Sequence, residues 1–158
     1  MNIWGLGAGP KFQALKHIFF YGRPKIIFIQ ETMHPASVTL AFFRKMFPKW
    51  HMVATDASSL SGGLAVIWDP TWIKASAFKC NVGIFISASI RGHSTSLNML
   101  NIYAPCRDRT PFWEWLFGSE ILDMDRIMLA GDFNVTLNAD EVWGGGRKLD
   151  QLGERIRK

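Results

Sequence analysis

The sequence predicts an α/β fold in which helices flank mixed or antiparallel sheets. Three observations lead to this prediction. Two or three stretches have apolar residues at helical spacing, about seven have the short apolar runs or the alternation of strands, and polar residues gather where several of these strands end. A chain of 158 residues is long enough for one domain with a sizeable core and too short to expect two.

The first part of the chain predicts two helices separated by a buried strand. Residues 10–21 have apolar side chains at helical spacing, with Pro10 suited to the first turn and Gly22 placed to end the helix. Residues 25–30 form a continuous run of β-branched and aromatic residues, which favours a strand buried on both faces. A second helix is expected over residues 37–47.

The middle of the chain predicts strands joined by turns. Residues 91–93 carry a turn signal between residues 84–90 and 95–103, so these two strands are expected to form a hairpin. A flexible turn is expected at residues 58–63. The other strands of this part are expected at residues 50–56, 64–68 and 72–78.

The last part of the chain predicts one short helix and one further strand. Thr110 is placed to cap a helix over residues 110–118, with Pro111 at its first position. The apolar run in residues 126–130 predicts a buried strand, and a glycine follows it directly.

Composition excludes several classes of protein. Apolar residues make up 48% of the chain and aromatic residues 13%, so the chain can bury enough surface to fold and is not a disordered segment. No apolar run approaches the roughly 18 residues of a membrane span. The N-terminus lacks the basic start and the long apolar stretch of a signal peptide. We therefore expect a nuclear or cytoplasmic protein that does not span a membrane.

Charge is unevenly distributed along the chain. The net charge is +5, and the first 55 residues carry seven Lys or Arg with Glu31 as their only acidic residue. Such a basic excess is compatible with a nucleic-acid partner without requiring one. Solvated surface is the simpler interpretation of most of these charges.

Cysteine and histidine form no metal-binding pattern in the sequence. Cys80 and Cys106 lack the spacing of a zinc site or a CxxC motif and are expected as free thiols, with one disulfide as the alternative. The four histidines are scattered, and each is expected on a helix face or in a loop.

Asp132 and Asn134 follow the strand at residues 126–130 and are two residues apart. A continued extended backbone would place both side chains on the same side of the chain. The alternative is a local turn, since Gly, Asp and Asn also close strands through their own hydrogen bonds.

Glu31 directly follows the buried strand at residues 25–30. A carboxylate at the edge of an apolar sheet costs free energy unless it is paired, hydrogen-bonded or bound to a metal. The alternative is that it accepts hydrogen bonds from the start of the next helix. Tyr103 ends the strand at residues 95–103, just before Pro105, and the simpler interpretation of Tyr103 is a buried ring with a satisfied hydroxyl.

The order and spacing of these polar residues resemble those of the endonuclease/exonuclease/phosphatase superfamily, which has the DNase I-like fold. Within it the sequence looks like the apurinic-type endonuclease domains of plant non-LTR retrotransposons. Residues 61–66 and 144–147 also resemble that subgroup. The resemblance rests on Asn2 and on the segments Gln30-Glu31-Thr32, Asn101-Ile102-Tyr103-Ala104-Pro105 and Gly131-Asp132-Phe133-Asn134.

The resemblance implies a four-layer α/β sandwich with a Mg²⁺-dependent endonuclease activity on the phosphodiester bonds of DNA, and Mn²⁺ is the alternative ion. Glu31 matches the metal-binding glutamate, and Asn2 matches the amide near it. Asp132 matches the residue that orients or deprotonates the attacking water, and Asn134 the amide that positions the water and the phosphate. Tyr103 matches a hydroxyl that contacts the phosphate or assists the leaving group. The implied partner is the phosphate backbone of DNA or RNA.

The sequence departs from the family in its last third. Relatives have further strands there and an Asp-His pair that serves the phosphate and the base, whereas this chain ends at Lys158 with no histidine in a matching context. We therefore expect a partial domain over residues 1–147, a polar basic tail over residues 148–158 that has the spacing for the start of a helix, and impaired hydrolysis. The alternatives are a non-catalytic nucleic-acid-binding remnant of a retrotransposon protein and a phosphatase acting on small phosphate esters.

Overall fold

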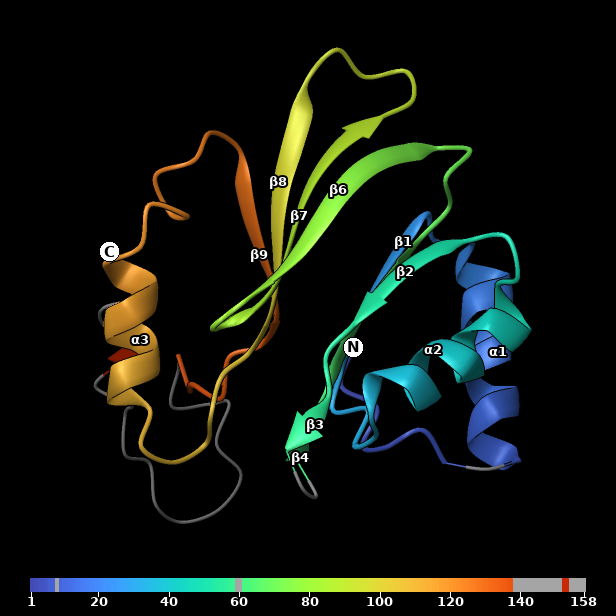
Figure 1. Ribbon diagram of the computed structural model, residues 1–158, viewed down its shortest axis with the longest axis horizontal. Helices are drawn as coiled ribbons and strands as arrows, with labels where there is room; N and C mark the ends of the chain where they lie inside the picture. Colours follow the sequence, from blue (N-terminus) through green and yellow to red (C-terminus); the bar gives the residue numbers. More distant parts are fainter. Residues whose placement is uncertain (8, 59–60, 138–151, 154–158) are drawn as a thin grey trace.

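The computed structural model describes residues 1–7, 9–58, 61–137 and 152–153. Its helices and main sheets form four layers (Figure 1). Helices α1 and α2 cover one sheet, that sheet packs on a second sheet, and α3 covers the far side of the second sheet. The predicted α/β fold with two sheets flanked by helices is therefore confirmed.

The first sheet is antiparallel and has the strand order β1-β5-β2. Strands β1 (Ile26–Gln30) and β2 (His51–Ala54) flank β5 (Leu64–Trp68). All five residues of β5 are buried, because the strand has a neighbour on each edge and a packed layer on each face.

Helix α1 (Pro10–Gly22) precedes β1, and helix α2 (Ala36–Met46) precedes β2. The end of α1 differs from the prediction, since Arg23 and not Gly22 stops the helix. Arg23 adopts the left-handed conformation, with φ of 42°, and donates its backbone N–H to the carbonyl oxygen of Phe19 at 3.0 Å.

A short hairpin replaces the flexible turn expected at residues 58–63. Strands β3 (Ala57–Ser58) and β4 (Ser61–Gly62) pair antiparallel. Gly62 and Gly63 both have φ of 77°, a left-handed conformation that glycine adopts without steric cost. These two glycines let the chain pass from the hairpin directly into β5.

The second sheet has the strand order β6-β7-β8-β9. Strands β6 (Ile73–Cys80), β7 (Gly83–Ile90) and β8 (Ser96–Tyr103) pair antiparallel, which confirms the predicted β7–β8 hairpin. Strand β9 (Ile127–Asp132) pairs with β8 in parallel, after a crossover through α3 (Thr110–Phe117). The carboxyl ends of β8 and β9 therefore lie at the same edge of the sheet.

Gly131 lets β9 approach β8 closely. Its φ is 151°, and a Cβ at this position would collide with the carbonyl oxygen of Ile102. The strand therefore continues two residues beyond Ala130, where the sequence predicted its end. As a result Asp132 pairs with Tyr103.

Helix α3 also begins differently from the prediction. Thr110, predicted as the cap, lies inside the helix, Arg109 precedes it, and no side chain caps this end. The Arg109 guanidinium instead donates a hydrogen bond to the carbonyl oxygen of Asn134 at 2.8 Å. The loop after β9 therefore holds the start of α3 in place.

Three apolar clusters fill the spaces between the four layers. Alternate residues of β5 belong to different clusters, because successive side chains of a strand point to opposite faces. Leu64, Val66 and Trp68 pack in the cluster between the two sheets. Ala65 and Ile67 pack in the cluster beneath α1 and α2.

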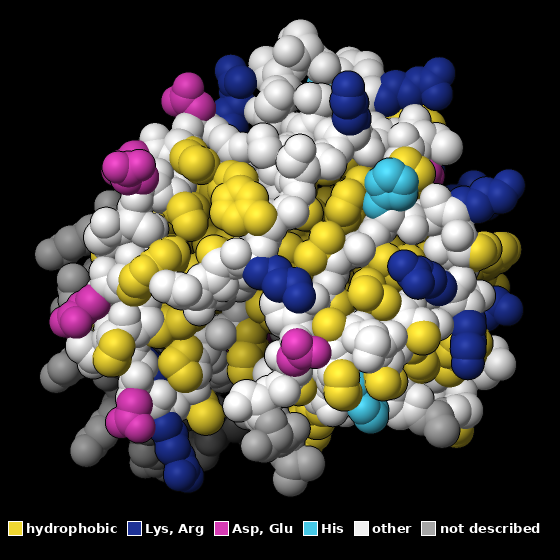
Figure 2. Space-filling model, viewed as in Figure 1, with side chains coloured by type: hydrophobic (Ala, Val, Ile, Leu, Met, Phe, Trp, Pro, Cys, Tyr) yellow, Lys and Arg dark blue, Asp and Glu magenta, His cyan; other side chains and the backbone are white. Residues whose placement is uncertain are grey.

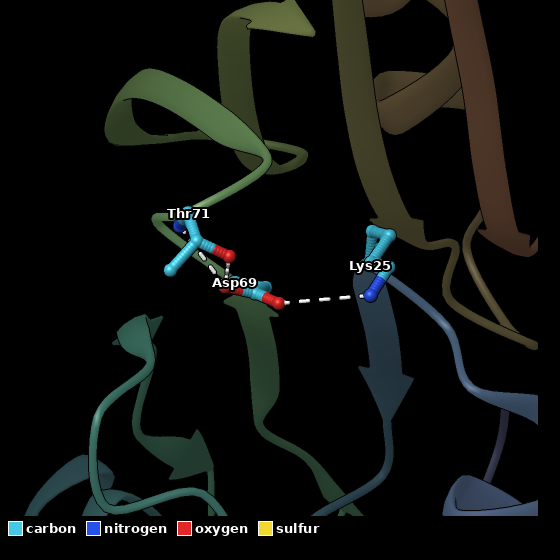
Figure 3. Close-up of polar contacts among 3 residues, drawn as sticks. All are labelled: Lys25, Asp69 and Thr71. Atoms are coloured by element: carbon cyan, nitrogen blue, oxygen red, sulfur yellow. Dashed lines mark hydrogen bonds and ion pairs between the residues drawn. The ribbon is translucent and has the colours of Figure 1, made fainter. Parts of the chain in front are cut away.

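An ion pair connects the residue before β1 with the residue after β5, at the ends of these strands that lie away from Gln30 and Leu64 (Figure 3). Lys25 Nζ lies 3.8 Å from Asp69 Oδ2. Asp69 Oδ1 also accepts hydrogen bonds from the backbone N–H of Thr71 at 3.0 Å and from its hydroxyl at 2.7 Å. The hydrogen bond from the Thr71 hydroxyl, helped by the positive charge of Lys25, holds the pKa of Asp69 below its usual range.

Some predictions fall partly or wholly outside the described residues. These are the predictions for residues 144–147 and for most of the tail at residues 148–158.

Cys80 is half-buried and Cys106 is exposed, and both are free thiols. In the described part of the chain, no helix is long and apolar enough to cross a membrane.

Candidate active site

The carboxyl ends of β1, β8 and β9 meet at one edge of the sandwich. Asn2 forms a parallel bridge with Gln30, the last residue of β1, and Tyr103 pairs with Asp132 at the ends of β8 and β9. Glu31 directly follows β1. Four residues predicted from separate parts of the sequence therefore come together at this edge.

A hydrogen bond joins Tyr103 to Glu31 across the two sheets. The Tyr103 hydroxyl donates to Glu31 Oε1 at 2.7 Å, and Glu31 is only 9% exposed. Its other oxygen, Oε2, is buried and has no hydrogen-bond partner among the described residues. Glu31 therefore does not accept hydrogen bonds from the start of the next helix, the alternative that the sequence left open. There the N–H of Ala36 donates to Asp56 Oδ1 at 2.7 Å.

Tyr103 has a strongly raised pKa. Burial of the phenol is the main cause, and the hydrogen bond to Glu31 and the negative charge of Glu31 add to it. The hydroxyl therefore stays protonated at neutral pH and serves as a hydrogen-bond donor.

A second hydrogen bond joins Asn2 to Asp132. Asn2 Nδ2 donates to Asp132 Oδ2 at 2.9 Å, while Asn2 Oδ1 accepts the backbone N–H of Trp4 at 3.1 Å. The two bonds fix which end of the amide faces the carboxylate. Asn2, predicted to lie near the metal-binding Glu31, thus has its side-chain contact with Asp132 in this structure.

Asn134 does not continue the extended strand, so the local turn is the one of the two alternatives that the structure shows. Its φ is 46°, and its backbone N–H donates to Asp132 Oδ1 at 3.1 Å, as in a local turn closed by an Asp side chain. The Asn134 side chain donates to the carbonyl oxygen of Ala104 at 2.5 Å. Asn134 therefore connects the loops that follow β8 and β9.

The backbone is strained at several points around this edge. Trp4, Glu31 and Met33 have φ of 49°, 54° and 54°, in the left-handed region that side chains other than glycine rarely adopt. Each such residue costs on the order of 1–3 kcal/mol and persists only when its surroundings hold it. Here the N–H of Gly5 donates to the carbonyl oxygen of Glu31 at 2.7 Å, and the N–H of Met33 to that of Gly62 at 3.1 Å.

Lys11 holds the segment that carries Asn2. Its Nζ donates to the carbonyl oxygens of Ile3, Trp4 and Gly5 at 3.0, 2.7 and 3.0 Å. Sequence reasoning missed Lys11, because its partners are backbone carbonyls and no side-chain pattern points to them.

Asn101 links the two sheets directly behind the site. This fully buried amide donates to the carbonyl oxygens of Ile29 and Ala65, both at 3.1 Å, and accepts from Gln30 Nε2 at 2.5 Å. All the polar atoms of the Asn101 side chain are thus bonded. The Asn101–Gln30 pair fixes the last residue of β1, from which Glu31 projects.

The residues at this edge fit a hard cation such as Mg²⁺. Glu31 Oε2 is a buried carboxylate oxygen without a partner, and Mg²⁺ prefers one or two carboxylates together with water and substrate phosphate. Among the described residues, no group of three or more His, Cys, Asp or Glu side chains could enclose a metal. The site therefore does not fit structural zinc, which takes four protein ligands.

The sequence matches no protein-family model and no curated protein. Solved structures, by contrast, resemble its fold. The AP endonuclease LMAP from Leishmania major is 13% identical with a TM-score of 0.68 over 92% of this chain and 57% of its own. The endonuclease domain of TRAS1, a telomere-specific non-LTR retrotransposon, is 13% identical with a TM-score of 0.67 over 99% of this chain and 67% of its own.

A humanized TDP2 of D. rerio is also similar, at 14% identity and a TM-score of 0.66 over 86% of this chain and 61% of its own. The three structures are DNase I-like members of the endonuclease/exonuclease/phosphatase family, and this chain shares their fold. It spans 57% to 67% of their lengths.

Proposed function

We propose that this chain hydrolyses phosphodiester bonds in DNA at the edge where β1, β8 and β9 end. The proposal rests on the Tyr103–Glu31 hydrogen bond beside the Asn2–Asp132 hydrogen bond. Two carboxylates, a hydroxyl and an amide from four segments lie at one edge, and one oxygen of Glu31 has no partner among the described residues. The fold supports the proposal, since two of the similar structures are endonucleases.

In this proposal Glu31 holds Mg²⁺, or Mn²⁺, through its unpartnered Oε2. When bound, the ion supplies positive charge that stabilises the charge developing on the phosphoryl oxygens. Tyr103 keeps Glu31 in position through Oε1. Because the Tyr103 hydroxyl stays protonated at neutral pH, it serves as a donor toward a phosphate oxygen and not as a base.

Asp132 is the residue that we assign to the attacking water. Its two oxygens accept hydrogen bonds from Asn2 Nδ2 and from the Asn134 N–H, so the carboxylate has a fixed orientation. Each carboxylate oxygen can accept a further hydrogen bond. A fixed carboxylate with free acceptor capacity can orient a water molecule and take its proton.

Asn134 acts on this site mainly through Asp132. Its N–H fixes Asp132, and its side chain is engaged with Ala104. The role implied by the resemblance, positioning of water and phosphate, requires the Asn134 amide to leave Ala104 when substrate binds.

The surface charge is compatible with a nucleic-acid partner. Figure 2 shows Lys and Arg side chains mainly at the top of the molecule, where Figure 1 places the β7–β8 turn, and on the right, where α1 and α2 lie. Asp and Glu side chains lie mainly on the left, beside α3. Positive charge near the first sheet favours binding of the phosphate backbone.

Incubation of the purified chain with supercoiled plasmid and Mg²⁺ tests the proposal. We expect nicking that stops when EDTA removes the ion. Salt-sensitive DNA binding without nicking would instead support a non-catalytic nucleic-acid-binding protein. Phosphate release from small phosphate esters without nicking would support a phosphatase.

A further inference from the structure

A cavity of about 380 Å³ lies next to Tyr103. Four parts of the fold line it: Thr55 just after β2, the start of β5, the turn between β6 and β7, and the segment from Tyr103 through Pro105 to Phe112 in α3. Tyr103 therefore belongs both to this cavity and to the candidate active site, where its hydroxyl bonds to Glu31.

The size of the cavity limits what can enter it. Ligand pockets in proteins typically have volumes of roughly 300–1,000 Å³, so this cavity is at the small end of that range. Such a pocket can hold one group of the size of a nucleoside. It is too small for a stacked base pair.

The walls of the cavity suit a flat aromatic ring. Leu64, Val82, Pro105 and Phe112 supply apolar surface, and a half-buried Phe ring is a stacking partner that accepts any base. Asn81 supplies an exposed amide in the β6–β7 turn. Its donor and acceptor can bond the edge of a base.

Positive charge is available beside the cavity for the attached phosphate. The loop that follows Pro105 carries Arg107 and Arg109, of which Arg107 is exposed. A guanidinium in this loop can contact phosphate on the strand that leads to the cavity.

We propose that this cavity takes the base of an unpaired nucleotide adjoining the phosphodiester at Tyr103, so that the preferred substrate has a single-stranded segment at the cleavage site. The inference rests on the proposed phosphodiesterase function. A base inside a continuous duplex reaches such a cavity only after it is unpaired and unstacked, which costs free energy, whereas a single strand avoids most of this cost.

Binding in EDTA tests the inference without relying on catalysis. Fluorescence anisotropy compares a labelled single-stranded oligothymidylate with a duplex of the same length. Phe112→Ala should weaken single-strand binding by roughly 5- to 150-fold, the range for loss of one base-stacking contact, and leave duplex binding unchanged. The matched control is Phe20→Ala, at a 69% exposed aromatic position on α1, which should change neither.

Asn81→Trp provides a second variant in case Phe112→Ala lowers stability. The indole should block the cavity and weaken single-strand binding, whereas His93→Trp should not. His93 is an exposed residue in the β7–β8 turn at the other end of the same sheet. The inference would be overturned if the wild type bound single strand and duplex equally. It would also be overturned if single-strand binding were unchanged in both Phe112→Ala and Asn81→Trp.

Cys80 offers an independent measurement because it also lines the cavity. In a Cys106→Ser variant, Cys80 is the only cysteine, and bound oligothymidylate should slow its reaction with a thiol reagent. Unchanged labelling at saturating oligothymidylate would contradict the inference. Plasmid nicking without the expected changes in binding and labelling would support the proposed function and exclude the base-binding role of the cavity. The expected changes without nicking would support the base-binding role and contradict the proposed function.

Discussion

The Tyr103 hydroxyl donates a hydrogen bond to Glu31 Oε1 at 2.7 Å, although the two residues are 72 positions apart in the sequence. Glu31 follows the first sheet and Tyr103 ends a strand of the second, so the bond crosses between the sheets at the edge where the other polar residues gather. The geometry of the proposed site therefore depends on the packing of one sheet on the other.

Tyr103→Phe should remove this bond and leave a buried carboxylate without a donor. The free energy of unfolding should fall by about 1–3 kcal/mol, the cost of an unsatisfied buried group, and plasmid nicking should slow by roughly tenfold or more, as expected for losing a hydrogen bond to a charged group. Urea unfolding and a nicking assay measure the two effects. Tyr21→Phe, at a 70% exposed position on α1, is the control and should change neither.

Asn101→Leu should destabilise the packing between the sheets. The substitution removes the donors to two buried carbonyl oxygens and the acceptor of Gln30, so the free energy of unfolding should fall by about 2–4 kcal/mol. Asn98→Leu, at a half-buried position on the same strand with one bond to the Asp125 carbonyl oxygen at 3.0 Å, should cost clearly less. Equal urea midpoints for the two variants would show that the Asn101 network contributes little.

Lys11→Met should release the segment that carries Asn2 while the core stays intact. Misplacement of a catalytic group by about 1 Å can cost roughly a hundredfold in rate, so nicking should slow much more than stability falls. Lys16→Met, at an exposed position on the same helix, is the matched control. Wild-type nicking by Lys11→Met would mean that the three carbonyl contacts do not position the site.

The depressed pKa of Asp69 predicts how stability depends on pH. Since the folded-state pKa lies below the unfolded value, the ionised carboxylate stabilises the fold at neutral pH. This contribution disappears as the pH falls through the folded-state pKa. Asp69→Asn should therefore lower the urea midpoint at pH 7. Its effect should be smaller near pH 3, which is below the ordinary Asp pKa of about 3.9. An effect of equal size at both values would contradict this assignment.

Sequence patterns predicted the buried strands well, because charges and turn residues bound the apolar runs. Residues 64–68 form β5 with the predicted ends. Glu31, Tyr103 and Asp132, which the sequence places near strand ends, lie together with Asn2, which entered through the family resemblance. Their catalytic roles stay predictions.

Other features depend on contacts that no local pattern contains. The parallel pairing of β8 with β9 depends on a crossover through α3, and the extension of β9 to Asp132 depends on the close approach of Gly131 to Ile102. The turn at Asn134 was one of two open alternatives, and its side chain bonds the carbonyl oxygen of Ala104, 30 residues earlier in the chain. Lys11 bonds only backbone carbonyls, which the sequence cannot show.

Comparison of nicking rates between carboxylate variants tests the proposed site itself. Under Mg²⁺ saturation, Glu31→Gln and Asp132→Asn should each reduce plasmid nicking by roughly a thousandfold or more, as is typical for members of a catalytic group. Asp69→Asn, at the opposite end of β5, should retain nicking, and circular dichroism should show all three variants folded. Nicking at the wild-type rate by folded Glu31→Gln or Asp132→Asn would contradict the assignment of the active site to this edge.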